Sequence, residues 1–533
     1  MKTIPIIASA GSQRKSVLAN DVVRHKSRVR KVLLIQPPAF SNNLRGDMNP
    51  NAPLGIGYIA AVLEREGYAV RILDAFIEGW HTETRINPEK MLVGLTYEEI
   101  KAIIAAEAPD VVGITSMFTA QRKNAHRIAE IAREVDPNIT VITGGAHPTS
   151  APESVLEDKN VDVVVLAEGD NTIVPLLQCI ERNGDLADVD GIAYRDPSGK
   201  PVVQDKTVQI ENLDTIPFPA RHLLPMEKYF SAGIRHGGYS RGNRATSMIS
   251  SRGCQYRCNF CTAFKVFTRH PRMRSTENVM AEIDELVTKY GVNEIFFEDD
   301  QLVAKQRHTN ELFDEMAKRF NIIWDTPNGV SPWLLNENVV AKMKAAGCYR
   351  VNLAIESGNQ YVLDKIINKP VKLHKLPELV RSIRKLGMEV GTYLVVGNIG
   401  KGGIETLEQM RESFRVCRKL GVSPHVSLLT AYPGSEVLDI AQEKGYLVPG
   451  FEWDNLIIQK FQIQTPEWTP AQVQDLVQRE MIKTRWWIFL TKPAWSIAFI
   501  WNHLVRDPML TLRKAAKFLT ATFVKTVYHP KTF

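Results

Sequence analysis

Residues 250–264 read SSRGCQYRCNFCTAF and hold Cys254, Cys258 and Cys261 in the spacing Cys-x3-Cys-x2-Cys. Thiols this close along a chain cannot easily pair with one another as disulfides. A zinc site normally needs a fourth ligand, and the nearest downstream candidate, His270, lies nine residues beyond the last cysteine. Three thiolates instead suit a [4Fe–4S] cluster in which one iron is left open for a bidentate ligand.

Short apolar stretches separated by helical patterns surround these cysteines and predict an α/β unit over residues 246–445. The cysteines directly follow the first expected strand, and loops at the C-terminal ends of such strands carry the chemistry of barrels. Because six βα units are too few for an eightfold barrel, we expect an open, partial (β/α)6 barrel. The expected strands are 246–250, 294–297, 322–326, 349–355, 389–396 and 425–429.

The chain before this unit predicts a second α/β domain, Rossmann-like, over residues 31–205. Apolar stretches at 32–36, 69–74, 111–115, 140–143 and 161–166 alternate with helical patterns, which is typical of a parallel sheet. Ligands of such sheets bind beyond the carboxyl ends of the strands. The sequence GIGYIA at 55–60 matches a dinucleotide fingerprint, but it lies 18 residues after the first strand, so tight helix packing explains its glycines better.

Three further segments complete the expected organisation. Residues 1–30 form a basic leader, which we interpret as solvated and poorly ordered, with a nucleic-acid arm as the alternative. Residues 206–245 include a proline-rich linker, and residues 446–533 form a helical C-terminal region rich in Trp and basic side chains. A net charge of +7 over 533 residues does not indicate nucleic acid as a partner.

The remaining cysteines and the absence of long apolar stretches indicate the compartment. Cys179, Cys348 and Cys417 are scattered and do not resemble a disulfide framework, and each is expected to lie in a core. No stretch reaches 18 apolar residues, and the first residues do not form a clean signal peptide. We therefore expect a cytoplasmic protein.

The spacing Cys-x3-Cys-x-aromatic-Cys, with Phe260 as the aromatic residue, resembles the signature of radical S-adenosylmethionine (SAM) enzymes. The resemblance implies that the open iron chelates the amino and carboxylate groups of SAM. The sequences FFEDD (296–300), AIESG (354–358) and AYPGSEV (431–437) fall where that family places contacts to the amino group, ribose and adenine. The implied SAM contacts are Phe260, Glu298, Asp299, Glu356, Ser357, Tyr432 and Pro433.

Strand ends of the N-terminal domain are followed by the loops QPPAFSN (36–42), TSMFTAQ (115–121), GGAHPTS (144–150) and AEGDNT (167–172). In this order, ahead of the cysteine unit, they resemble the cobalamin-binding domain of B12-dependent radical SAM enzymes. The sequences PLGIGYIAAVLEREGY (53–68), GGAHPT (144–149) and AIESGNQ (354–360) most resemble the C-methyltransferases of fosfomycin-type phosphonate pathways. The motif D-x-H-x-x-G is absent, so the resemblance implies cobalt without a His ligand, and His147 is expected to serve as a cap or ribose contact. The implied cobalamin contacts are Pro37, Pro38, Ser116, Gly144, Gly145, His147, Glu168 and Gly169.

These resemblances imply a cobalamin-dependent radical SAM methyltransferase that moves a methyl group from SAM through methylcobalamin to an unactivated carbon of a small molecule. A cyclase or rearrangement enzyme with the same cofactors is the alternative, and a cobalamin-binding sensor or carrier is an alternative of another class. No individual residue is assigned as catalytic. The expected reductant is a carrier such as flavodoxin or ferredoxin.

The C-terminal region has two interpretations. Trp486, Trp487, Trp495 and Trp501 flank apolar stretches, and Arg513, Lys514, Lys517 and Lys525 punctuate the last helical pattern. This composition suits peripheral contact with the inner membrane surface. It also suits a helix packed on the barrel with a basic outer face.

Overall fold

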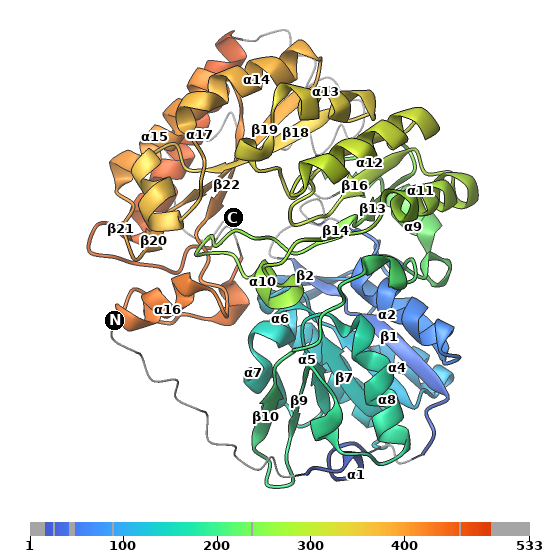
Figure 1. Ribbon diagram of the computed structural model, residues 1–533. Coiled ribbons are helices and arrows are strands. Elements are labelled where there is room, and N and C mark those ends of the chain that lie inside the picture. The colour runs from blue at the N-terminus through green and yellow to red at the C-terminus, as the bar shows by residue number, and fades with distance from the viewer. Residues whose placement is uncertain are drawn as a thin grey trace, which may run out of the picture.

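The computed structural model describes residues 16–24, 27–41, 48, 50–87, 90–235, 238–457 and 460–491. Two α/β units lie against each other, the N-terminal one in blue to teal and the second in green to orange (Figure 1). Among these residues, none of the helices is long and apolar enough to cross a membrane.

The N-terminal unit is built on a seven-stranded sheet in the order β10-β9-β8-β7-β6-β1-β3. Five of its strands, β3, β1, β6, β7 and β8, are parallel and agree with the sequence prediction. Strands β9 and β10 add an antiparallel hairpin next to β8. The strands are β1 (Lys31–Gln36), β3 (Ala69–Asp74), β6 (Val111–Thr115), β7 (Thr140–Gly144), β8 (Val163–Val165), β9 (Ile192–Arg195) and β10 (Pro201–Gln204). The main helices are α2 (Leu54–Arg65), α4 (Tyr97–Glu107), α5 (Arg122–Val135) and α8 (Ile173–Glu181).

A small antiparallel sheet of β2 (Ala39–Ser41), β5 (Lys90–Val93) and β4 (Glu83–Asn87) was not predicted. Its longest strand reads ETRIN and is exposed at four of five positions, so it carries no apolar alternation that a sequence pattern could reveal.

The second unit contains six parallel strands in two groups, β13-β16-β17 and β18-β19-β22. Parallel bridges from Trp324 to Cys348 and from Val330 to Leu353 join the two groups into one curved sheet. The expected partial (β/α)6 barrel is thereby confirmed. Its strands are β13 (Ala245–Met248), β16 (Glu294–Phe297), β17 (Ile323–Asp325), β18 (Arg350–Glu356), β19 (Glu389–Val396) and β22 (Pro424–Leu428). Its helices are α11 (Thr276–Tyr290), α12 (Gln306–Arg319), α13 (Glu337–Ala345), α14 (Leu376–Lys385), α15 (Leu407–Leu420) and α16 (Glu436–Glu443).

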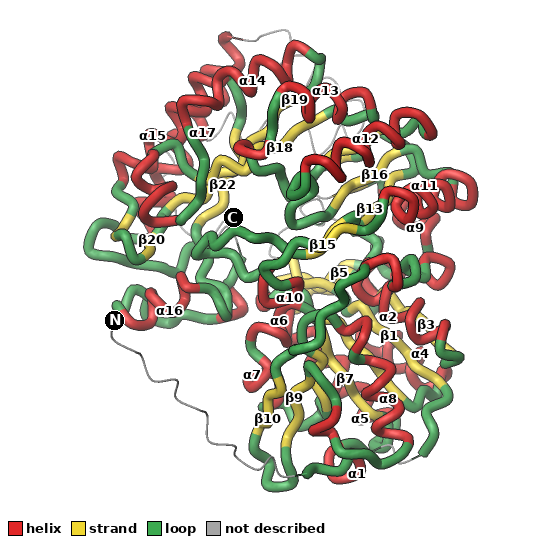
Figure 2. Tube along the Cα trace, in the orientation of Figure 1, coloured by secondary structure: helices red, strands yellow, loops and turns green. Residues whose placement is uncertain are grey.

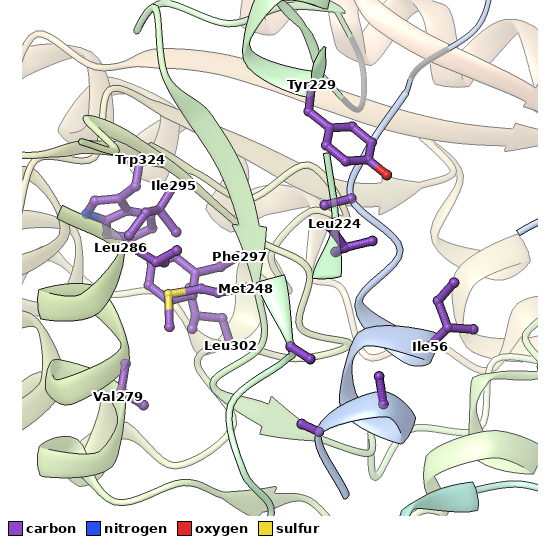
Figure 3. Packing of buried hydrophobic residues seen from close by; sticks show 14 of the residues in the cluster. Ile56, Leu224, Tyr229, Met248, Val279, Leu286, Ile295, Phe297, Leu302 and Trp324 are labelled. Atoms are coloured by element: carbon purple, nitrogen blue, oxygen red, sulfur yellow. The ribbon is translucent and has the colours of Figure 1, made fainter. Parts of the chain in front are cut away.

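One hydrophobic core runs through both units. Figure 3 shows Ile56 of α2 and the barrel residue Met248 in the same packed region as Leu224 and Tyr229, which come from the segment between the units. That segment contains η5 (Leu213–Thr215), η6 (Arg221–Leu223) and α9 (Met226–Ala232), and half of its residues from 213 to 230 are buried. It is therefore packed structure and not an exposed linker, because its apolar residues fill the junction without following a helical or strand period.

The two ends of the described chain also pack on the rest of the molecule. Val17, Val23 and Val29 of the leader are buried against the N-terminal unit, whereas its basic residues Arg24, Arg28 and Arg30 are exposed. At the other end, α17 (Pro470–Thr491) lies along α15, where Arg418 pairs with Glu480 at 2.8 Å. Of the residues expected to face a membrane, Trp486 and Trp487 belong to α17. Trp495, Trp501, Arg513, Lys514, Lys517 and Lys525 lie outside the described residues.

Candidate functional site

The cysteine loop lies at the junction of the two units. It follows β14 (Ser251–Arg252), precedes α10 (Ala263–Phe267), and α10 packs against α6 (Ala146–Ser150) of the N-terminal unit. Figure 2 shows this loop between the strands of the barrel above and those of the N-terminal sheet below. The carboxyl ends of β7 and of the first barrel strand thus both reach the same junction.

Cys254, Cys258 and Cys261 are free thiols, partly exposed and within electrostatic reach of one another. Burial raises the pKa of all three, that of Cys261 to about 11, while the Lys369 ammonium opposes the rise. No set of three His, Cys, Asp or Glu side chains in the described chain is placed to hold a single metal ion. The donor set of three thiols beside one buried cation suits a thiolate-ligated cluster, whose anionic charge the cation would offset.

Two neighbours of the cysteines hold the loop in place. The Asn259 side-chain amide donates to the carbonyl oxygens of Ile366 and Ile399 at 2.9 and 2.8 Å. Phe260, the aromatic residue of the signature, packs beside Cys258 against the buried residues of η8 (Val362–Ile367). The loop is therefore fixed by the segments that follow β18 and β19.

The acidic run after β16 separates into three environments. Glu298 accepts a hydrogen bond from the Ser247 hydroxyl at 3.1 Å, and Asp299 is buried, where it accepts from the Ser250 hydroxyl at 2.7 Å and also from Ser251. Asp300 differs because its Oδ2 is buried without a hydrogen-bond partner. Burial, together with the negative charge of Asp299, raises the pKa of Asp300 to about 6. Asp299 thus anchors the strand before the cysteines, and Asp300 keeps an acceptor free.

The residues after β18 face the cysteines through an ion pair. Glu356 has a left-handed backbone (φ 65°) and pairs with Lys369 at 2.7 Å, both groups being buried. Burial alone would lower the pKa of Lys369, but the Glu356 carboxylate and the nearby cysteines outweigh it and raise that pKa. Ser357 is fully buried and accepts a hydrogen bond from the Asn359 backbone at 3.2 Å, so its hydroxyl serves the local turn.

The loop after β22 also reaches the junction. Tyr432 is partly buried and Pro433 fully so, and burial raises the pKa of the tyrosine. A Cβ added to the neighbouring Gly434 would lie 3.3 Å from Lys265 of α10 and 3.7 Å from Ser150 of α6. This loop therefore lies between the cysteine segment and the N-terminal unit.

The carboxyl edge of the N-terminal sheet holds unpaired polar atoms. The Ser116 hydroxyl and both ring nitrogens of His147 are buried without hydrogen-bond partners, and they line one small enclosed cavity. Gly145 has φ +112°, and a Cβ there would lie 2.8 Å from the Ser116 carbonyl oxygen, so only glycine fits. Burial lowers the pKa of His147 to about 4, which leaves the imidazole neutral at pH 7. Buried polar atoms without partners at a strand-end edge are groups that a bound polar ligand could satisfy.

The other predicted cobalamin contacts are engaged within the protein. Pro37 and Pro38 are buried, and the Pro38 carbonyl oxygen accepts from the Asn124 amide at 2.8 Å. Gly144 accepts through its carbonyl from the Ser116 backbone at 2.8 Å. Gly169 lies in η3 (Gly169–Asn171), close to Ile59 of α2.

Glu168 belongs to an ionic network that joins the two units, here named the junction network and made of Glu168, Asp170, Arg252 and Arg272. Arg252 donates to Glu168 at 2.9 Å and to Asp170 at 2.8 and 3.1 Å, and Arg272 donates to Glu168 at 2.7 Å. All four side chains are buried. Since Arg252 is two residues before Cys254, the network ties the N-terminal sheet directly to the cysteine loop.

A short segment from the C-terminal region closes the same edge. Trp453, in η10 (Trp453–Asn455), lies edge-on to His147 with ring centroids 5.9 Å apart, and Asp454 forms an ion pair with Arg122. Sequence patterns did not point to this segment, or to Asn259, Arg252 and Lys369. Asp300 lay within the motif FFEDD (296–300) but was not chosen as one of the SAM contacts.

Comparison with protein families finds two matches in one chain. Residues 48–177 match the B12 binding domain, and residues 248–417 match the radical SAM superfamily. These spans contain the cysteine loop and the loops after β6, β7 and β8.

Individual relatives agree with this pairing of domains. The chain is 35% identical over 451 residues to a cytidylyl-2-hydroxyethylphosphonate methyltransferase of Streptomyces wedmorensis, covering 79% of this chain and 83% of that protein. It is 27% identical to an anaerobic magnesium-protoporphyrin IX monomethyl ester cyclase of Rubrivivax gelatinosus, covering 89% and 80%. In fold it resembles the radical SAM methyltransferase TsrM of Kitasatospora setae, solved with cobalamin and a [4Fe–4S] cluster, with TM-score 0.62 and 19% identity over 78% of this chain and 76% of that one.

Proposed function

The chain belongs to the cobalamin-dependent radical SAM methyltransferases, and from this premise we propose that it methylates an unactivated sp3 carbon of a small polar molecule and consumes two SAM molecules per product. The observation that carries the proposal is the junction itself. The cysteine loop and the cobalamin-facing edge of the N-terminal sheet meet there, joined by the junction network. Cofactors bound at these two sites could react in turn with one substrate without exposing reactive intermediates to water.

The bound cofactors would supply reductive cleavage of SAM at the cluster and methyl carriage on cobalt. In our proposal the chain's own residues bind and orient them. Cys254, Cys258 and Cys261 hold the cluster, and the free oxygen of Asp300 accepts a hydrogen bond from the amino group of SAM. A charge-assisted hydrogen bond of this type is among the stronger polar contacts in a protein.

On the opposite side, Ser116, Gly145 and His147 would receive cobalamin, with the neutral imidazole of His147 as a hydrogen-bond partner and not as a cobalt ligand. Arg252 and Glu168 act as positioning residues, because they fix the distance between the two cofactor-facing edges. Trp453 packs on His147 and would keep water from that edge.

The stoichiometry of the SAM products tests the proposal. The reconstituted enzyme, hydroxocobalamin, a reductant and cytidylyl-2-hydroxyethylphosphonate as the first candidate substrate would be incubated without oxygen. We expect 5′-deoxyadenosine and S-adenosylhomocysteine in equal amounts and a mass gain of one methyl group. If 5′-deoxyadenosine forms and the substrate is converted, but no S-adenosylhomocysteine appears, the result would instead favour ring formation, the reaction named for the cyclase relative.

We also propose a peripheral contact with anionic membrane at the end of α17. Trp487, Phe489 and Leu490 are exposed there, Leu490 at 73% of its surface. Aromatic and aliphatic side chains of this kind insert into the interfacial region of a bilayer. Flotation with anionic liposomes would compare the wild-type chain with a W487S/F489S/L490S variant, and equal binding of the two proteins would reject this contact.

A further inference from the structure

A cavity of about 350 Å³ lies between the cysteine loop and the segment after β18. It is lined by Gln255, Tyr256 and Arg257, which lie between the first two cysteines, and by residues of the segment after β18: Asp364, Asn368, Lys369, Pro370 and Lys372. The same loop therefore has two faces. One faces the N-terminal unit, and the other forms the wall of a cavity that opens to solvent.

The rim of this cavity is basic. Arg257 and Lys372 line it and are exposed, and Asp364, 3.4 Å from Lys372, is the carboxylate among the lining residues. We name the exposed polar lining residues Gln255, Arg257, Asp364, Asn368 and Lys372 the basic platform. Its two cations against one carboxylate give it a net positive charge, which attracts an acidic surface and speeds its encounter.

The platform is thin and firmly held. Cys258 packs directly beneath it against Val362, Ile366 and Ile367 of η8. Gln360 fixes the segment from within by donating to Asp364 at 3.0 Å and to the Val371 carbonyl oxygen at 2.8 Å. The buried ammonium of Lys369 lies between the cavity and the cysteines. A carrier seated on the platform would therefore lie against the same segments that pack on Cys258.

We infer that the basic platform is the docking surface for an acidic one-electron carrier protein of the flavin or iron–sulfur class. The inference rests on the proposed function, because reductive cleavage of SAM requires an electron. In each transfer the carrier is oxidised by one electron and the cluster is reduced by one, and no bond is made or broken at the platform. A small, polar, short-lived interface is what electron-transfer partners form.

The experiment compares a protein reductant with a small one. Full-length, cluster-loaded wild type and an R257E/K372E variant would be assayed for 5′-deoxyadenosine formation with reduced flavodoxin and, separately, with dithionite, which needs no docking surface. We expect the flavodoxin-driven rate of the variant to fall about tenfold or more at low salt. The dithionite-driven rate should stay within about twofold of the wild type, as electrostatic steering does not govern a small reductant.

A matched charge reversal, K289E/K318E, changes two exposed lysines on α11 and α12 and should leave both rates unchanged. Direct titration with oxidised flavodoxin measures the binding affinity of the two proteins and does not depend on turnover. If the charge reversal disturbs cluster loading, the milder R257Q/K372Q variant replaces R257E/K372E. Equal flavodoxin rates in wild type and variant would overturn the inference, as would an equal fall with both reductants at full iron content. Failure of the wild type with both reductants would count against the proposed function and not against the platform.

Discussion

The two edges that meet at the junction are built from different chemistry. The barrel edge carries ionisable groups, Asp299, Asp300 and the Glu356–Lys369 pair, within a few residues of its strand ends. The edge of the N-terminal sheet presents a hydroxyl, a glycine and an imidazole that burial keeps neutral. Its two carboxylates, Glu168 and Asp170, are committed to arginines of the barrel.

The difference matches the proposed ligands. SAM is a small zwitterion with a sulfonium, so its site needs charged partners at fixed positions. The corrin ring is large, with amide groups around its edge, so its site needs space, close backbone approach and a few hydrogen-bonding groups. Which ligand each edge receives thus follows from the charge that the edge carries.

The strongest test removes the cluster ligands. A C254A/C258A/C261A variant should lose all four irons and the visible absorption of the cluster, because no other cysteine lies in the loop. Hydroxocobalamin binding, followed by its absorption spectrum, should persist, since the N-terminal edge has its own contacts. Full iron retention would refute the cluster assignment, and joint loss of cobalamin would show that the two edges are not separate.

The second test breaks the junction network. R252A would leave Asp170 and part of Glu168 as buried charges without partners, so the free energy of unfolding should fall by about 3–5 kcal/mol. R319A, which removes a solvent-exposed pair with Glu277, should cost far less than R252A. Chemical denaturation of both variants measures the difference. Similar costs would mean that the junction is not held by this network.

The third test concerns Asp300. D300N retains shape but loses the negative charge proposed to face the SAM amino group, so SAM should bind about 10- to 100-fold more weakly. Calorimetric titration of the cluster-loaded protein measures this affinity. D364N, at an exposed carboxylate outside the junction, should bind SAM as the wild type does. Unchanged affinity in D300N would assign the contact to another residue.

The smallest effect is expected at His147 and depends on pH. Its pKa is about 4 in the folded protein, below the ordinary value of 6.5, so protonation favours the unfolded chain. The wild type should therefore lose stability as pH falls below 6.5, by about 2 kcal/mol at pH 5, while H147F should lack this component. Urea unfolding of both proteins at pH 7.5 and pH 5 checks the sign. Parallel losses would show that His147 is not held neutral.

Sequence patterns predicted the strands best where burial is two-sided. The apolar strands β1 and β8 were visible because each contains a continuous apolar stretch, whereas β4 is polar and exposed and left no pattern. The cysteines were visible because their ligand spacing is local. Sequence patterns could not reveal the contacts of Arg252, Glu168 and Trp453, because the partner residues lie from 84 to more than 300 positions away along the chain. Only the folded chain brings these residues together.

The junction network also bears on how such enzymes could be recombined. A cobalamin-binding domain taken from a relative would place its own side chains opposite Arg252 and Arg272, which are buried and cannot turn to water. Without two carboxylates at the positions of Glu168 and Asp170, the hybrid would enclose uncompensated positive charge. The N-terminal domain of this protein is therefore not an interchangeable module, and a successful graft must carry the acidic loop or replace the arginines together with it.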